Sequence, residues 1–131
     1  MNAADYTLEQ LRAWAPDHIP VSGFERRIAQ TEVFVTEDGS GITGIGSLTG
    51  GDYLDLLFVR HDRQRRGLGR LLIAAIEHSA RSAGGVSALT SDVSITAKPL
   101  FIASGFNIIT EQMVELRGQT LKNFKMLKNL A

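Results

Sequence analysis

The segment from residue 52 to residue 83 constrains the fold of this 131-residue chain more than any other. It opens with DYLDLLFVRH (52–61), whose nearly continuous apolar centre predicts a central strand covered on both faces. A basic, glycine-containing loop follows, and then apolar residues recur at the three-and-four spacing of an amphipathic helix that a Gly-Gly pair ends. The next apolar run, VSALTS (86–91), is a buried strand. We therefore expect the two strands to be parallel neighbours joined by the helix.

The rest of the chain predicts further strands and short helices without a break between domains. Helices are predicted at LEQLRAWA (8–15), FERRIAQ (24–30) and ITAKPLFIAS (95–104), and strands at EVFVTED (32–38), GITGIGSLTG (41–50), FNIITEQMVEL (106–116) and TLKNFKML (120–127). We predict one α+β domain over residues 1–131. Its mixed sheet is mostly antiparallel, around a central parallel strand-helix-strand unit.

Charge and cysteine content exclude several classes of function. Lys plus Arg and Asp plus Glu are equal at 14 each, so no global field attracts nucleic acid or a membrane surface. The absence of cysteine excludes disulfides, thiolate zinc sites and cysteine nucleophiles. No apolar run approaches the roughly 20 residues of a membrane-spanning helix and no signal-peptide pattern is present, which favours a cytoplasmic protein. His18, His61 and His78 lack metal-ligand spacing, so we predict no metal, with His61 and His78 facing solvent.

The loop RQRRGLGRLL (63–72) holds four arginines and two glycines between the predicted strand and helix. A glycine in a helix interior costs roughly 0.5 to 1 kcal/mol relative to alanine, so two in the first turn need a reason. Free amides at a helix N-terminus bind anions, and glycine lets a phosphate approach them while arginines add donors. The alternative is that Gly67 and Gly69 only allow the helix to pack closely on a strand and that the arginines are solvated.

Neither the Rossmann nor the Walker pattern is present in this loop. Residues 64–69 (QRRGLG) match Q/R-x-x-G-x-G/A instead, and so resemble the pyrophosphate-binding loop of the GNAT superfamily of N-acetyltransferases. SITAKPLFIASGF (94–106) is similar to the later N-x-x-A-x-x-x-Y-x-x-x-G-F segment of that family. The last strands resemble a small bacterial subgroup with unassigned substrates. The resemblance covers about residues 5–129 and implies the GNAT fold.

This resemblance implies that acetyl-coenzyme A is the cosubstrate and that its acetyl group moves, by direct attack, to an amine of a small molecule or peptide. In the family, the central strand pairs with the pantetheine arm through its backbone, and the glycine loop holds the pyrophosphate. The positions that correspond to coenzyme-binding residues are Leu57, Phe58, Val59, Gln64, Arg65, Arg66, Gly67, Leu68, Gly69, Arg70, Ser94 and Phe101.

Asp55 is the candidate catalytic base. It lies two residues before Leu57 and four before Val59, so period-two alternation predicts that all three share a face of the sheet. It also matches the position of the acidic residue that serves as base in polyamine-type GNAT enzymes. Desolvation within the apolar run would favour a base able to act near neutral pH. The alternative is a structural carboxylate held by backbone amides or by an arginine.

Aromatic residues supply the remaining candidates. Tyr53, two residues before Asp55, is a possible pocket wall or general acid, with core packing as the alternative. Tyr6 and Trp14 lie where the family forms its acceptor pocket, or else pack between helices. Phe101 stands where many GNAT enzymes carry a tyrosine that protonates the departing thiolate, which phenylalanine cannot do. The general acid is therefore unassigned.

The chain also departs from the GNAT pattern at its start, where the usual first strand and helix are missing. We expect a homodimer to cover the resulting open sheet edge, with a shielding helix or a shortened coding region as alternatives. Two functions fit these departures. The first is an N-acetyltransferase. The second is a catalytically weak coenzyme-A-binding sensor or partner-binding protein.

Overall fold

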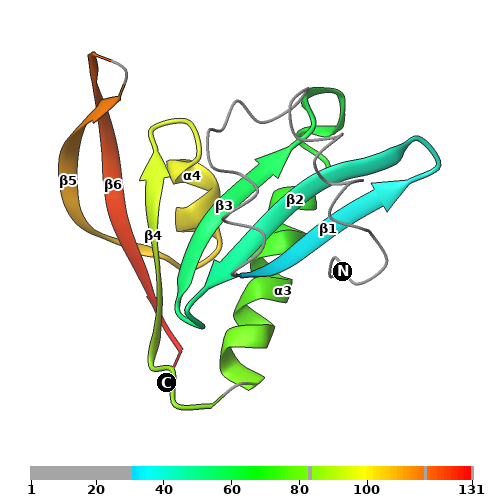
Figure 1. Ribbon diagram of the computed structural model, residues 1–131, viewed down its shortest axis with the longest axis horizontal. Helices are drawn as coiled ribbons and strands as arrows, with labels where there is room; N and C mark the ends of the chain where they lie inside the picture. The colour runs from blue at the N-terminus through cyan, green and yellow to red at the C-terminus, as the bar shows by residue number, and fades with distance from the viewer. Residues whose placement is uncertain (1–30, 83, 117, 131) are drawn as a thin grey trace.

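The computed structural model describes residues 31–82, 84–116 and 118–130 (Figure 1). Its elements in chain order are β1 (Glu32–Asp38), β2 (Gly41–Thr49), β3 (Tyr53–Val59), the 3-10 turn η2 (His61–Arg63), α3 (Leu68–Ser82), β4 (Ala88–Ser94), α4 (Lys98–Ala103), β5 (Asn107–Leu116) and β6 (Gln119–Asn129). The helices predicted at 8–15 and 24–30 lie outside the described residues, as do Tyr6 and Trp14. That residues 1–131 form one domain stays a prediction.

The six strands form one sheet in the order β1-β2-β3-β4-β6-β5. Every neighbouring pair is antiparallel except β3 and β4, which are parallel and joined through α3. In Figure 1, α3 crosses behind β1, β2 and β3, while β6 and β5 lie on the other side of β4 and complete the sheet. The prediction of a mixed sheet around a parallel strand-helix-strand unit is confirmed.

The bounds of β4 and β6 differ from the prediction at both ends of each strand. β4 begins two residues later than the apolar run suggested, and it continues to Ser94. Every second side chain of this strand, from Leu89 through Ser91 to Val93, is buried, while Asp92 and Ser94 are exposed. β4 therefore persists through polar residues because its antiparallel pairing with β6 continues as far as Ser94. Pairing with β4 and β5 likewise extends β6 beyond the predicted 120–127.

Helix α3 packs its apolar face on the sheet. Leu72, Ile73, Ile76 and Ala80 are buried there. Two glycines of β2 face the helix and leave no room for a side chain. A Cβ added to Gly44 would lie 3.2 Å from Leu72 Cδ1, and one added to Gly46 would lie 3.0 Å from Ile76 Cδ1. These glycines allow the helix to approach the sheet closely.

β1 lies at one edge of the sheet, paired with β2 along its length. Within residues 31–130 no other strand pairs with it, so the expectation that a partner chain covers an open edge stays a prediction. The helices that the structure describes are all too short or too polar to cross a membrane.

Replacing Gly44 by alanine should destabilise the fold through this close packing. Its Cβ would lie 2.8 Å from Thr36 Oγ1, which is already hydrogen-bonded to Thr43, and 3.2 Å from the Phe58 carbonyl oxygen. We expect the free energy of unfolding to fall by about 1 to 3 kcal/mol, the usual cost of overpacking, in urea titrations. Gly39→Ala is the matched control, because nothing lies within 4 Å of its added Cβ. Equal losses in both variants would contradict this account.

Candidate functional site

The central feature of the site is the point at which β3 and β4 part. Their ladder consists of one residue pair, Tyr53 with Thr90. Two further bonds hold the strands together there: the Thr90 N–H donates to the Asp52 carbonyl at 2.9 Å, and Ser91 Oγ donates to the Leu54 carbonyl at 2.7 Å. Beyond them the sheet opens into a wedge between the C-terminal ends of β3 and β4.

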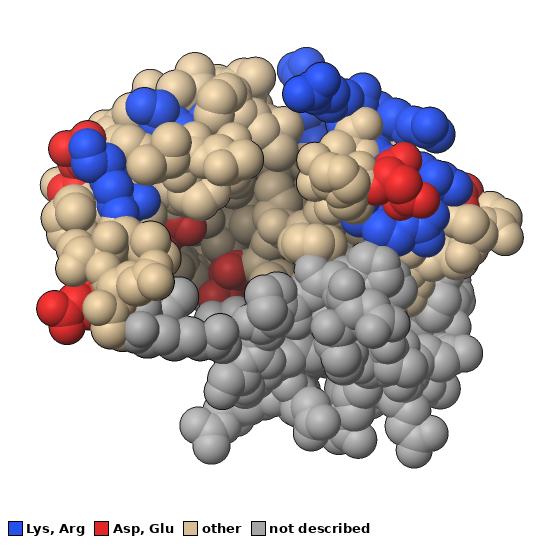
Figure 2. All heavy atoms as spheres, turned by 90° about the horizontal axis from the view of Figure 1, so that it is seen from above, with Lys and Arg blue, Asp and Glu red and all other residues tan. Residues whose placement is uncertain are grey.

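A cavity of about 780 Å³ fills this wedge and reaches the start of α3. Figure 2 shows a hollow in the surface with basic side chains gathered to one side. The acidic atoms visible in that hollow do not belong to residues that line the cavity. The cavity is lined by Leu57, Phe58, Val59, Gln64, Arg65, Gly67, Leu68, Gly69, Arg70, Ser94, Thr96, Ala97 and Leu100. Ten of the twelve predicted coenzyme-binding residues are thus brought together, and Arg66 and Phe101 are not among them.

The backbone of β3 presents hydrogen-bonding groups to the wedge. The Arg60 N–H donates to the Thr43 carbonyl on β2 at 2.7 Å. Because backbone groups of an antiparallel strand alternate in direction, those of Phe58 also point to β2, whereas those of Leu57 and Val59 point to the opposite edge. This edge is the one that faces the cavity, where Gln64 Nε2 already donates to the Val59 carbonyl at 3.3 Å.

The N-terminus of α3 closes the cavity with free amides. The first helical bond runs from the Leu71 N–H to the Gly67 carbonyl at 3.0 Å, so the N–H groups of residues 68–70 precede the helical ladder. Gly67 has φ 79°, and nothing lies within 4 Å of its missing Cβ. Gly67 is therefore needed for its left-handed backbone and not for space. Arg65, at φ 64°, is the only non-glycine residue in the described ranges with a positive φ.

Gly69 serves a different purpose from Gly67. A Cβ at Gly69 would lie 2.7 Å from Leu100 Cδ2 on α4. The close packing considered from the sequence is thus present at Gly69, but against α4 and not against a strand. Gly69 and Leu100 both line the cavity, so this contact also shapes its wall.

Arg60, just before the loop, and Arg63, its first residue, form ion pairs that anchor it. Arg60 Nε lies 2.5 Å from Asp62 Oδ1, and Arg63 Nε lies 2.8 Å from Asp38 Oδ2. Both guanidinium groups also donate to Ser40 Oγ, at 2.8 and 3.2 Å. The hydrogen bond from Arg63 holds the pKa of Asp38 well below its usual value, and that from Arg60 lowers the pKa of Asp62. These contacts tie the loop to the turn between β1 and β2.

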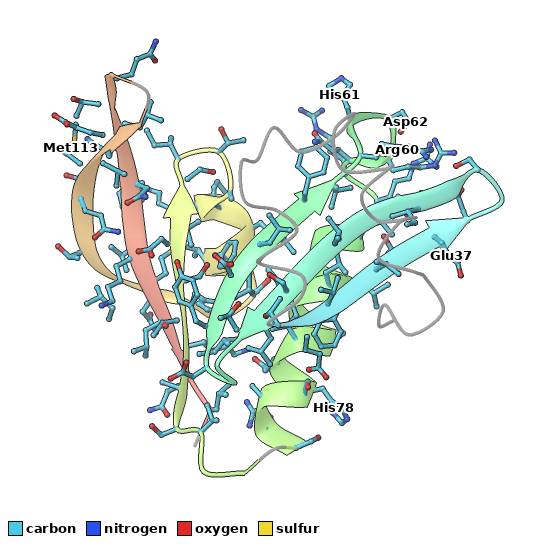
Figure 3. The ribbon with its side chains drawn as sticks, viewed as in Figure 1. Glu37, Arg60, His61, Asp62, His78 and Met113 are labelled. Carbon is cyan, nitrogen blue, oxygen red and sulfur yellow. The ribbon has the colours of Figure 1, made fainter. Side chains whose placement is uncertain are left out.

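The other three arginines between residues 60 and 70, which are Arg65, Arg66 and Arg70, are exposed. Arg65 and Arg70 line the cavity, whereas Arg66 does not, and within the described ranges no ion pair engages any of the three. His61 and His78 are exposed as predicted, His61 beside Arg60 on the loop and His78 on α3 (Figure 3). Among the residues with described coordinates, no group of three or more His, Asp or Glu is placed to hold a metal ion.

Asp55 does not share a face with Leu57 and Val59, so that prediction was wrong. Ser47 and Leu48 are adjacent on β2, yet they pair with Leu56 and Leu54, which leaves Asp55 as the extra residue of a β-bulge. The bulge breaks the alternation, since Leu54 and, beyond the bulge, Leu57 and Val59 all pack into the core beneath α3. Asp55 is thereby turned, half-buried, toward the other face of the sheet.

Tyr53 lies on this same face and takes part in a network that the sequence did not predict. Its Oη donates to Asp92 Oδ2 at 2.6 Å, and Gln112 Nε2 donates to Asp92 Oδ1 at 2.7 Å. Burial, followed by the hydrogen bond to Asp92 and the charges of Asp92 and Asp55, raises the pKa of Tyr53 above its ordinary value. Core packing, the alternative considered for Tyr53, does not describe this environment.

Phe101 lies in the core and is 2% exposed. Its ring contacts that of Phe106 with centroids 5.0 Å apart. One helical step, about 100°, separates it from Leu100, so the two side chains of α4 face different directions, Leu100 to the cavity and Phe101 to the core. Thr96, Ala97 and Leu100 also line the cavity but were not predicted to do so, although the three-residue spacing of Ala97 and Leu100 within the predicted helix was an available signal.

A second hollow of about 430 Å³ adjoins the first and shares Gly67 and Arg70 with it. It lies between α3 and the end of α4. Lys128 lies there, donating to the Ser104 carbonyl at 2.8 Å and pairing with Glu77 of α3. The start of α3 is therefore flanked by hollows on two sides.

Comparisons with known proteins agree with this geometry. Residues 2–128 match the acetyltransferase (GNAT) domain family. The uncharacterized N-acetyltransferase YafP of Escherichia coli K12 is 36% identical over 121 residues, which is 92% of this chain and 75% of YafP. A GCN5-related N-acetyltransferase structure from Rhodopseudomonas palustris superposes with a TM-score of 0.76 at 32% identity, covering 98% of this chain and 80% of that one. A Bacillus subtilis acetyltransferase solved with CoA gives 0.75 at 14% identity over 96% and 95%, a likeness of fold alone.

The ion pair that anchors the loop should make stability depend on pH. Because the folded-state pKa of Asp38 lies below the unfolded value of 3.8, its contribution is present above that pH and is lost as the pH falls further. We expect Asp38→Asn to lower the melting temperature at pH 7 and the difference from the wild type to shrink steadily as the pH falls below 3.8. Arg63→Gln, which removes the partner, should reproduce the same profile in thermal melts. A difference that is constant with pH would contradict the assignment.

Proposed function

Because the chain belongs to the GNAT acetyltransferase family and is thus an acetyl-CoA-dependent acyltransferase, we propose that it acetylates an amine of a small molecule or peptide by direct attack. The observation that carries this proposal is the wedge between β3 and β4. It opens, within one cavity, from the unpaired strand edge at Leu57 and Val59 to the free amides of α3.

The residues of this cavity fit acetyl-CoA in two separate ways. Leu57 and Val59 offer backbone donors and acceptors along an open strand edge, which suits the amide groups of a pantetheine arm. The amides of residues 68–70, the helix dipole and the guanidinium groups of Arg65 and Arg70 suit a pyrophosphate. When bound, acetyl-CoA supplies an activated acetyl thioester. The second hollow, which shares Arg70 with the cavity, would take the nucleotide end of the bound coenzyme.

For the chemistry, this chain contributes a base and backbone donors. Asp55 is the proposed base, since the bulge turns its carboxylate to the face of the sheet that also carries Tyr53. It would take a proton from the acceptor amine, directly or through water. A backbone N–H of Leu57 or Val59 would polarise the thioester carbonyl. Phe101 has no proton to give and lies in the core, so we assign no general acid.

Coenzyme binding should separate the arginines that line the cavity from the one that does not. We expect Arg65→Ala and Arg70→Ala each to raise the Kd for coenzyme A about tenfold, the loss of one charge-assisted hydrogen bond, in isothermal titration. Arg66→Ala is the matched control, because Arg66 is also exposed and lies in the same loop but outside the cavity. An equal effect at all three positions would mean that only the net charge of the loop matters.

Turnover should depend on Asp55 while coenzyme binding does not. With a panel of small amines and peptides and a free-thiol readout, we expect Asp55→Asn to lower kcat at least a hundredfold, within the range typical of a general base. The Kd for coenzyme A should stay unchanged, because Asp55 does not line the cavity. Tight coenzyme binding without turnover on any acceptor would contradict the proposed function, as would full activity of Asp55→Asn.

A further inference from the structure

Hydrogen bonds join three strands at the place where β3 and β4 part. Tyr53 comes from β3, Asp92 from β4 and Gln112 from β5, with β6 lying between the last two strands. Each carboxylate oxygen of Asp92 accepts one bond, at 2.6 Å from Tyr53 Oη and at 2.7 Å from Gln112 Nε2. Two donors on opposite sides therefore fix the orientation of this carboxylate.

The position of this network within the site is specific. Tyr53 and Thr90 form the pair after which the two strands diverge, and Asp92 lies two residues beyond Thr90. The bond from Tyr53 to Asp92 thus spans the strands at the closed end of the wedge. Leu54 and Val93, the neighbours of these two residues, are buried beneath α3, so Tyr53 and Asp92 project from the other face, the one that Asp55 also faces.

The hydrogen bond to Asp92 decides what the Tyr53 hydroxyl offers to a third group. Its hydrogen is committed to Asp92, so its oxygen meets any other group only as an acceptor. The raised pKa of Tyr53, caused first by burial, keeps the phenol neutral and this arrangement intact across the physiological range. An N–H of an amine is a donor of the kind that such an oxygen binds.

We propose that Asp92 is a positioning residue, which orients the Tyr53 hydroxyl so that its oxygen accepts an N–H of the acceptor amine beside Asp55. This inference rests on the proposed function, because it takes that face of the sheet as the place where the amine attacks. Gln112 holds Asp92 from the opposite side. Tyr53 touches the substrate, whereas Asp92 acts through Tyr53.

A different role for Asp92 would be direct contact with a cationic acceptor. Lys125, the residue opposite Asp92 on β6, forms no ion pair with it in the part of the chain that the structure describes, so this lysine does not rule out such a contact. Direct contact and positioning predict different energetics, however. Two residues that bind the substrate independently have additive effects, whereas a positioning residue has no effect once the group it positions is removed.

The test is a double-mutant cycle on Tyr53→Phe and Asp92→Ala. The concentration of an amine from the panel that the wild type acetylates is varied at saturating acetyl-CoA. We expect each single variant to lower kcat/KM for the amine about tenfold, the loss of one hydrogen bond. The double variant should fall no lower than Tyr53→Phe alone. The KM for acetyl-CoA should not change, because neither residue lines the coenzyme cavity. Lys125→Gln is the control for local charge and should leave all constants unchanged.

Several outcomes would overturn the inference. A hundredfold loss in the double variant would show that Asp92 acts on the substrate independently of Tyr53. Unchanged amine kinetics would reduce the network to a structural role, as would a rise in the KM for acetyl-CoA equal to that for the amine. The proposed function fails in a distinguishable way, because then the wild type would acetylate no amine, or Asp55→Asn would retain full activity.

Discussion

Everything in this site depends on the separation of β3 from β4 after a single ladder pair. Parallel strands normally satisfy each other's backbone groups along their length. Here Tyr53 and Thr90 pair once, and the strands then diverge, so the edge of β3 at Leu57 and Val59 is left facing a cavity. The groups that a neighbouring strand would otherwise have bonded become a binding surface, and the start of α3 lies at its far end.

The arginines of the basic segment have two different roles: some anchor the loop and others face the cavity. Arg60 and Arg63 form ion pairs with carboxylates and donate hydrogen bonds to Ser40 at the β1–β2 turn. Arg65 and Arg70 line the cavity instead. The loop therefore enters the site already anchored. Charge alone does not distinguish these roles, since all four side chains are guanidinium groups within eleven residues of chain.

Much of this arrangement could be predicted from the sequence, because the signals are local. The apolar run of β3, the glycine loop and the periodic helix specified the central unit. The resemblance to the GNAT family, over the strand, the loop and the later segment, identified ten residues that line one cavity. The bulge at Asp55 could not be predicted, since it depends on how β2 pairs with β3. The same holds for the network of Asp92 with Tyr53 and Gln112, whose members are 39 and 20 residues away from Asp92 in the chain.

The β-bulge in β3 has a consequence for how this strand tolerates change. The bulge shifts the alternation of side chains by one residue. The leucines before and after it pack into the same core, while the carboxylate of the inserted Asp55 lies on the other face of the sheet. Deleting Asp55 would remove the extra residue, so Leu54, Leu56 and Leu57 would alternate regularly against β2 and the core pattern would be kept without the carboxylate. The core pattern of β3 therefore does not depend on the bulge, whereas the position of the carboxylate on the other face does.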